Sequence, residues 1–185
     1  MVINNNISIA PTCVASWQSL VQEAGHKSHL YLNEDLESYL IFLLIRFTKN
    51  TQLASSILAL EYLETHNIQG SAQREHLRDL GDKCLLFAGF YPEQAHRRLV
   101  SLPYFVNLGR DAYDQIAKKT LNSNQLYEGL NNLFNQLAIN FVNLLSILQQ
   151  IKLLNRTHSW LPDEITKYEQ QMLAKTQANK VIIMH

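Results

Sequence analysis

The segment between Glu128 and Lys152 restricts the fold more than any other part of the chain. No charged residue lies between these two positions, and eight asparagine and glutamine residues are interspersed with large apolar residues. At the rotation of about 100° per residue in an α-helix, the amides and Ser146 fall on one half of the surface and the large apolar side chains on the other, apart from Ile139 and Ile147. The pattern predicts one long amphipathic helix over residues 123–152, not a membrane span.

Residues that form turns are scarce in the whole chain. Only six glycines and four prolines occur among 185 residues, of which 46% are hydrophobic. This mixture disfavours a β-sandwich, which needs many tight turns, and favours long helices with short connections. The length suits one domain with a sizeable core. We therefore expect a single all-α domain over residues 1–185, a bundle of about eight helices, with residues 1–11 and 179–185 frayed at its ends.

Capping residues, prolines and glycines mark the expected helix boundaries. A glycine inside the fourth helix, Gly81, indicates close packing against a neighbouring helix, because an interior glycine costs about 1 kcal/mol relative to alanine. The eight helices are expected to begin near Pro11, Asn33, Leu53, Ser71, Pro92, Leu102, Ser123 and Asp163, and the first, second and fourth to end near Gly25, Asn50 and Gly89.

The second predicted helix contains the most hydrophobic run of the chain. Residues from Tyr39 to Ile45 are apolar on every side of a helix, and the run is far shorter than the roughly 20 residues that span a membrane. We expect it to form the buried central helix of the bundle. Arg46 ends the run, and its charge should either reach solvent or meet a carboxylate.

Charge and cysteine content exclude several classes of function. Sixteen basic residues balance sixteen acidic ones, so the chain has no excess positive charge for binding nucleic acid. Cys13 and Cys84 lie far apart in sequence, which favours reduced thiols in the core over a redox pair. The first residues have no basic stretch followed by an apolar run, so we expect no signal peptide and a cytoplasmic location.

Two Glu-x-x-His patterns, at Glu23–His26 and Glu93–His96, have the spacing found in carboxylate-bridged metal centres of helical bundles. Both lie at expected helix ends, whereas such a centre needs ligands inside helices that face the core. We therefore predict no metal site. Nucleophile elbows, phosphate-binding loops and dinucleotide fingerprints are also missing from the sequence, so no cofactor is expected and the chain is not expected to be an enzyme.

The densest polar cluster runs from Arg74 to Asp82, and Glu93, His96, Arg97 and Arg98 follow shortly after the turn at Gly89–Pro92. The spacing of Arg78 and Asp82 suits an ion pair on one helix face, and a solvated helix surface is the simplest interpretation. Alternatively, the corner at Gly89–Pro92 brings polar groups around a small cleft that binds a ligand or performs acid–base chemistry. The candidate ligand-binding residues are His76, Arg78, Asp79, Asp82, His96, Arg97, Arg98, Tyr104 and Tyr113.

The amide-rich side of the segment 123–152 has two explanations. It reflects either a bias toward asparagine in the whole chain or a surface that another helix or chain covers. In the second case, Asn135 and Asn143 are the interface candidates. The abundant helix surface and the missing catalytic motifs lead us to expect a non-enzymatic protein–protein interaction or adaptor domain that binds a protein partner or self-associates. The alternative is a small-ligand-binding or enzymatic domain that uses the polar corner at residues 76–98.

The middle of the chain also resembles a known family. The residues that carry the resemblance are Leu36–Phe47, Leu77–Asp82, Leu86–Glu93, Tyr104–Phe105 and Gly109–Tyr113. Their pattern is similar to "LGD … GFFPE … YY … G … AY" in a family of uncharacterised proteobacterial all-helical proteins. The resemblance covers about half of the chain. It implies a helical bacterial protein and carries no activity with it.

Overall fold

The computed structural model describes residues 6–49, 71–92, 101–121 and 128–158. These residues form six α-helices and no strand, so the described part of the chain is all-α, as predicted. The helices are α1 (Asn6–Ser28), α2 (Glu34–Lys49), α4 (Ser71–Phe90), α6 (Leu102–Leu121), α7 (Glu128–Ile139) and α8 (Phe141–His158). The helices predicted from Leu53, Pro92 and Asp163 lie outside the described residues.

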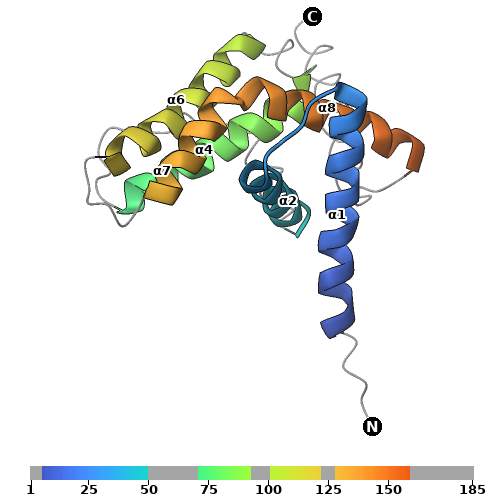
Figure 1. The fold of residues 1–185 in the computed structure, drawn as a ribbon. Helices are drawn as coiled ribbons and strands as arrows, with labels where there is room; N and C mark the ends of the chain where they lie inside the picture. Colours follow the sequence, from blue (N-terminus) through green and yellow to red (C-terminus); the bar gives the residue numbers. More distant parts are fainter. Residues whose placement is uncertain (1–5, 50–70, 93–100, 122–127, 159–185) are drawn as a thin grey trace, which may run out of the picture.

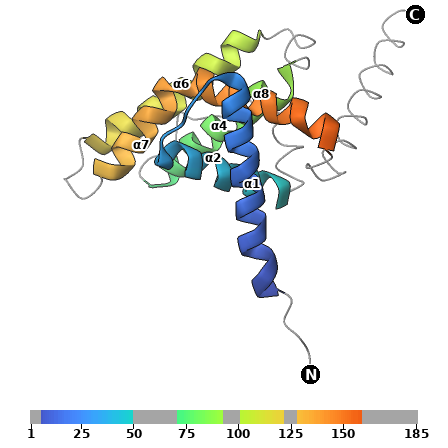
Figure 2. The same cartoon turned by 45° about the vertical axis from the view of Figure 1, so that its right-hand side comes forward.

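Two groups of helices share one apolar core. In the first, α6 packs against both α4 and α7; in the second, α2 packs against α1. Helix α8 joins the groups, because it contacts α4 on one side and α1 on the other (Figure 1). The N-terminal part of α1 projects away from the other helices, which a second view also shows (Figure 2).

Helix α2 begins as the sequence predicts. The side-chain Oδ1 of Asn33 accepts a hydrogen bond from the backbone N–H of Leu36 at 3.0 Å, which is the geometry of an N-cap. Leu40, Leu44 and Phe47 are completely buried, so the helix contributes a large part of the core. The expectation that its apolar run is enclosed on every side is wrong at Phe42, which is 62% exposed.

Helix α1 is longer than predicted at both ends. It begins at Asn6, before Pro11, and it continues past Gly25 to Ser28. The helix ends at His29, which has a φ of 55°, while the backbone N–H of Leu30 donates to the carbonyl of Gly25 at 2.9 Å. This is a Schellman arrangement in which histidine occupies the left-handed position that usually holds glycine. The prediction failed because glycine was assumed to take that position.

The predicted long helix over residues 123–152 is two helices, α7 and α8, which meet at Asn140 with a bend of 68°. The side chain of Asn140 donates to the carbonyl of Gln136 at 3.0 Å and accepts from the Asn143 amide at 3.2 Å. Asparagine side chains that bond to the local backbone in this way compete with regular helix geometry. The bend directs α8 away from α6 and across α4 and α1, so it decides the shape of the core.

Helix α4 also runs beyond its predicted end, through Gly89 to Phe90. A β-carbon on Gly89 would lie 2.6 Å from the β-carbon of Leu148, so the glycine allows α8 to pack closely rather than stopping α4. The ammonium group of Lys152 on α8 donates to the carbonyl of Phe90, which places a positive charge at the C-terminus of α4. Phe87, Phe90 and Tyr91 fill the described part of this corner and are buried.

In the described part of the chain, no single helix is long and apolar enough to cross a membrane. The bent pair Asn132–Ile139 and Phe141–Leu154 meets the length and composition of a span only when its two halves are counted together.

Candidate functional site

A buried carboxylate lies where α2, α4 and α6 meet. Asp82 on α4 is 1% exposed, and its Oδ1 accepts hydrogen bonds from the hydroxyl of Tyr39 at 2.6 Å and from the hydroxyl of Tyr113 at 2.7 Å. Its Oδ2 accepts a hydrogen bond from the guanidinium of Arg46 on α2. We call these four residues the Asp82 centre. Each of the three helices contributes at least one of them, so the centre ties the helices together.

Close helix packing makes this centre possible. Gly81 precedes Asp82, and a β-carbon at this position would overlap the ring of Tyr113. Phe134 from α7 adds an aromatic wall, with its ring centre 5.9 Å from that of Tyr113 and 6.2 Å from that of Tyr39. The prediction that Gly81 marks a close helix contact is confirmed.

The electrostatics of the centre result from burial and from its hydrogen bonds. Burial raises the pKa of the Asp82 carboxyl, and the hydrogen bonds from Tyr39 and Tyr113 and the charge of Arg46 act against this rise. Burial, together with the nearby Asp82, also raises the pKa of both phenols. The phenols therefore keep their protons and act as donors, which suits a structural junction better than a site of proton transfer.

The structure brings together only some of the predicted ligand-binding residues. Asp82 and Tyr113 belong to the Asp82 centre, and the Arg78 Nε lies 3.8 Å from Asp82 Oδ2, as the spacing predicted. The guanidinium of Arg78 also lies over the Tyr39 ring, 5.6 Å from its centre. The solvated surface expected for this pair is wrong for Asp82, because the helix turns that carboxylate into the core.

The other candidates do not join this group. Asp79 pairs with Lys83 on the surface of α4 at 2.9 Å, and Tyr104 is exposed and packs edge-on against Phe105. The Nε2 atom of His76 is buried and has no hydrogen-bond partner among the described residues. His96, Arg97 and Arg98 lie outside the described residues.

Sequence reasoning missed one member of the centre and left another open. Arg46 was expected either to reach solvent or to meet a carboxylate, and it does meet one, although its side chain stays 38% exposed. Tyr39 was assigned only to the apolar run of α2. No local signal separates it from its neighbours, because its hydroxyl finds a partner 43 positions further along the chain.

Both cysteines are free, and burial raises the pKa of the Cys84 thiol to about 12, so it stays protonated and unreactive at neutral pH. Glu23 of the first Glu-x-x-His pattern pairs with Lys27 at 3.0 Å. Within the described ranges, no group of three or more His, Cys, Asp or Glu residues is placed to hold a metal ion.

A second unusual region lies on the outside of α7 and α8. Ile139 is 67% exposed and Val142 is 54% exposed, and they lie on either side of the bend at Asn140. Asn135 and Asn143, the two interface candidates, are exposed in the same two helices. We call this surface the outer face. It consists of Asn132, Asn135, Ile139, Val142 and Asn143, which are all exposed.

Comparisons of the chain with protein-family models, with curated proteins and with solved structures find no match. The resemblance to proteobacterial helical proteins therefore stays a prediction from the residues that carry it.

Proposed function

We propose that this chain is a non-enzymatic cytoplasmic interaction domain that binds a protein partner, or a second copy of itself, through the outer face of α7 and α8. The single observation that carries the proposal is the exposure of two large aliphatic side chains, Ile139 and Val142, within a segment that has no charged residue. Charged residues are depleted in the cores of protein interfaces, and exposed apolar stripes are typical of surfaces that another molecule covers.

The alternative explanation, a general bias toward asparagine, accounts for only part of this surface. It explains Asn135 and Asn143 but not the large aliphatic side chains beside them. Scattered apolar residues are normal on protein surfaces. In this case, however, Ile139 and Val142 are only three positions apart along the chain, and each lies within four positions of an exposed interface candidate, Asn135 or Asn143.

The Asp82 centre supports the same proposal by its chemistry. Its carboxylate is buried, and its oxygens are engaged by two phenols and a guanidinium, so it is arranged to hold three helices in register. Helices α6 and α2 of this unit pack against α7, so they hold the outer face in a fixed shape. We propose that the described helices act as one such unit.

The test is to place charge on the outer face and follow association. We expect Asn135→Lys combined with Asn143→Glu to abolish capture of a stoichiometric partner in affinity purification from the native host, or to convert a self-associated form to monomer in sedimentation equilibrium. Asn107→Lys is the matched control, because Asn107 is an exposed asparagine on α6. Unchanged oligomeric state and partner capture in the double variant would refute the proposal.

A further inference from the structure

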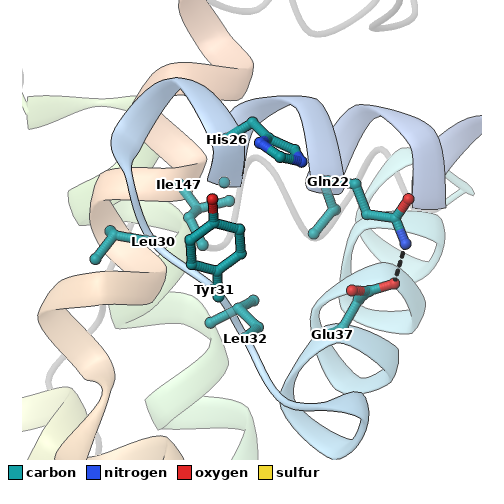
Figure 3. Close-up of a pocket in the computed structure, with 9 residues that line it drawn as sticks. Gln22, His26, Leu30, Tyr31, Leu32, Glu37 and Ile147 are labelled. Carbon is teal, nitrogen blue, oxygen red and sulfur yellow. Dashed lines mark hydrogen bonds between the residues drawn. The ribbon is translucent and has the colours of Figure 1, made fainter.

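A pocket of about 270 Å³ lies between the C-terminal end of α1, the connection over residues 29–33, the start of α2 and the side of α8. Its wall is apolar where Val21, Leu30, Leu32 and Ile147 line it, and polar where Gln22, His26 and Glu37 line it. Figure 3 shows Tyr31 standing in the space between α1 and α2, with Ile147 behind it. Pockets of drug-sized ligands occupy roughly 300–1,000 Å³, so this one suits a smaller molecule.

The carboxylate of Glu37 is held in a defined orientation. Its Oε1 accepts a hydrogen bond from the side-chain amide of Gln22 at 2.9 Å (Figure 3) and another from the side-chain amide of Gln18 at 3.2 Å. Among the described residues, its Oε2 accepts no hydrogen bond, and no Lys, Arg or His forms an ion pair with Glu37. One oxygen is thus fixed by neutral donors, while the other is an open acceptor with negative charge.

An aromatic ring lies on the other side of the pocket. Tyr31 is 79% exposed, and its ring meets the His26 ring edge-on at 5.6 Å between ring centres. A solvent-exposed tyrosine face attracts cations through its π-electrons. A carboxylate with an open oxygen, an aromatic face and an apolar wall together match a small amine with an apolar body.

The pocket is formed before any ligand arrives, because the connection that carries Tyr31 is tied down at both ends. At its start, Leu30 donates to the Gly25 carbonyl, and the Leu30 carbonyl lies so close to Gly25 that a β-carbon there would be 2.7 Å away. At its end, Asn33 caps α2 and also donates to the side chain of Gln136 on α7. Little ordering is left to oppose binding.

From this geometry we propose that the pocket binds a small primary ammonium ion with a branched apolar body. The ammonium group donates to Glu37 Oε2 and lies near the Tyr31 ring, and the apolar part rests on Val21, Leu32 and Ile147. The proposal is independent of the outer face of α7 and α8, because none of these residues belongs to it.

The test uses three probes that share one apolar body. These are 3,3-dimethylbutylamine, 3,3-dimethylbutan-1-ol and 3,3-dimethylbutyrate, each titrated into the full chain and followed by amide chemical shifts in NMR. We expect the amine to bind in the millimolar range or tighter and to shift the amide signals of Gly25, Tyr31 and Glu37. The alcohol should bind at least about fivefold more weakly, and the carboxylate more weakly still.

Substitutions then separate the pocket from general surface charge. Glu37→Gln keeps the side-chain shape and should weaken amine binding about tenfold, and Tyr31→Leu should weaken it about threefold. Glu34→Gln is the matched control, since Glu34 is exposed in the same first turn of α2 but does not line the pocket. All three positions are exposed or partly exposed, so the variants should fold.

Several results would overturn the proposal. One is equal binding of the amine and the alcohol, and another is preference for the carboxylate. The proposal also fails if the amine does not bind at about 10 mM, a concentration on the order of the dissociation constant of a very weak site, or if Glu37→Gln leaves the affinity for the amine unchanged. An equal loss in Glu34→Gln would also contradict it, because it would show that the amine responds to the overall charge of this end of α2.

Discussion

The Asp82 centre and the outer face of α7 and α8 depart from the usual distribution of residues in opposite directions. In the first, charged and polar groups are buried; in the second, large aliphatic groups are exposed. Both oxygens of the buried carboxylate find partners within the chain, because two phenols and a guanidinium converge on it. Within the described residues, the aliphatic groups of the outer face have no such partner.

This difference separates a structural role from an interaction role. A buried carboxylate costs several kcal/mol of free energy unless its partners are well placed, so a complete set of partners indicates that the centre maintains the fold. The exposed side chains of Ile139 and Val142 add little hydrophobic free energy to the folding of the monomer, because they stay in contact with water. They stabilise a complex only when another molecule covers them. The predictions below test this division.

The largest effect should come from removing the buried carboxylate. Asp82→Ala leaves the hydroxyls of Tyr39 and Tyr113 buried without their acceptor and removes the partner of Arg46. We expect the free energy of unfolding to fall by about 3–5 kcal/mol, measured by urea denaturation followed by circular dichroism. Asp79→Ala, on the surface of the same helix, should change it by less than about 0.5 kcal/mol. Similar losses in both variants would contradict the structural role.

A smaller loss is expected from removing one phenol donor. Tyr113→Phe keeps the ring packed against Gly81 but removes the hydrogen bond to Asp82 Oδ1. The free energy of unfolding should fall by about 1–2 kcal/mol, because a buried acceptor loses one of its donors. Tyr104→Phe is the matched control, since Tyr104 is exposed on the same helix. If Tyr113→Phe leaves the free energy of unfolding unchanged, Tyr39 and Arg46 alone provide the hydrogen bonds that the Asp82 carboxylate needs.

The pH dependence of stability should reveal whether burial or hydrogen bonding dominates at Asp82. Burial raises the folded-state pKa of Asp82 above the unfolded value of about 3.9, so the folded chain binds more protons between the two values. The stabilisation that results from this raised pKa of Asp82 is fully present below about pH 3.9. It decreases as the pH rises through the folded-state pKa.

The measurement compares the wild type with Asp82→Asn in urea denaturation between about pH 4 and pH 7. Because the variant cannot titrate at this position, its stability deficit should become smaller as the pH rises. The opposite trend, a deficit that grows with pH, would mean that Arg46 and the two phenols outweigh burial and lower the pKa of Asp82.

The smallest effect on stability is expected on the outer face. Ile139→Ser and Val142→Ser should each change the free energy of unfolding by less than about 0.5 kcal/mol, because these side chains are already exposed to water. The same substitutions should weaken partner binding or self-association, measured by sedimentation. Leu144→Ser is the contrasting change, since Leu144 is fully buried. A marked loss of stability in Ile139→Ser would show that this face supports the fold.

Much of the fold could be predicted because helical signals are local. The cap at Asn33 and the start of α4 at Ser71 depend on residues within a few positions of one another, and both are confirmed. The end of α1 could not be predicted from local signals, since His29 rather than glycine adopts the positive φ. The bend at Asn140 was also missed, because the apolar period continues through it without a break.

The candidate site was harder to predict than the helices. The spacing of Arg78 and Asp82 correctly predicted that they lie close together, but not that Asp82 is buried. The pocket beside Glu37 had no signal in the sequence, because its walls come from α1, the connection after it, α2 and α8. Residues from four segments meet there only after the chain has folded.

The amino-acid sequence by itself determined that this chain forms amphipathic helices and that the segment 129–151 carries no charge. Periodicity and capping are properties of neighbouring residues, so they can be read before any folding is known. Only the tertiary structure decided that Tyr39, Arg46 and Tyr113 surround Asp82 and that Ile139 and Val142 stay exposed. The physical reason is that burial and hydrogen-bond partners depend on which helices pack together, and contacts between distant segments set that packing.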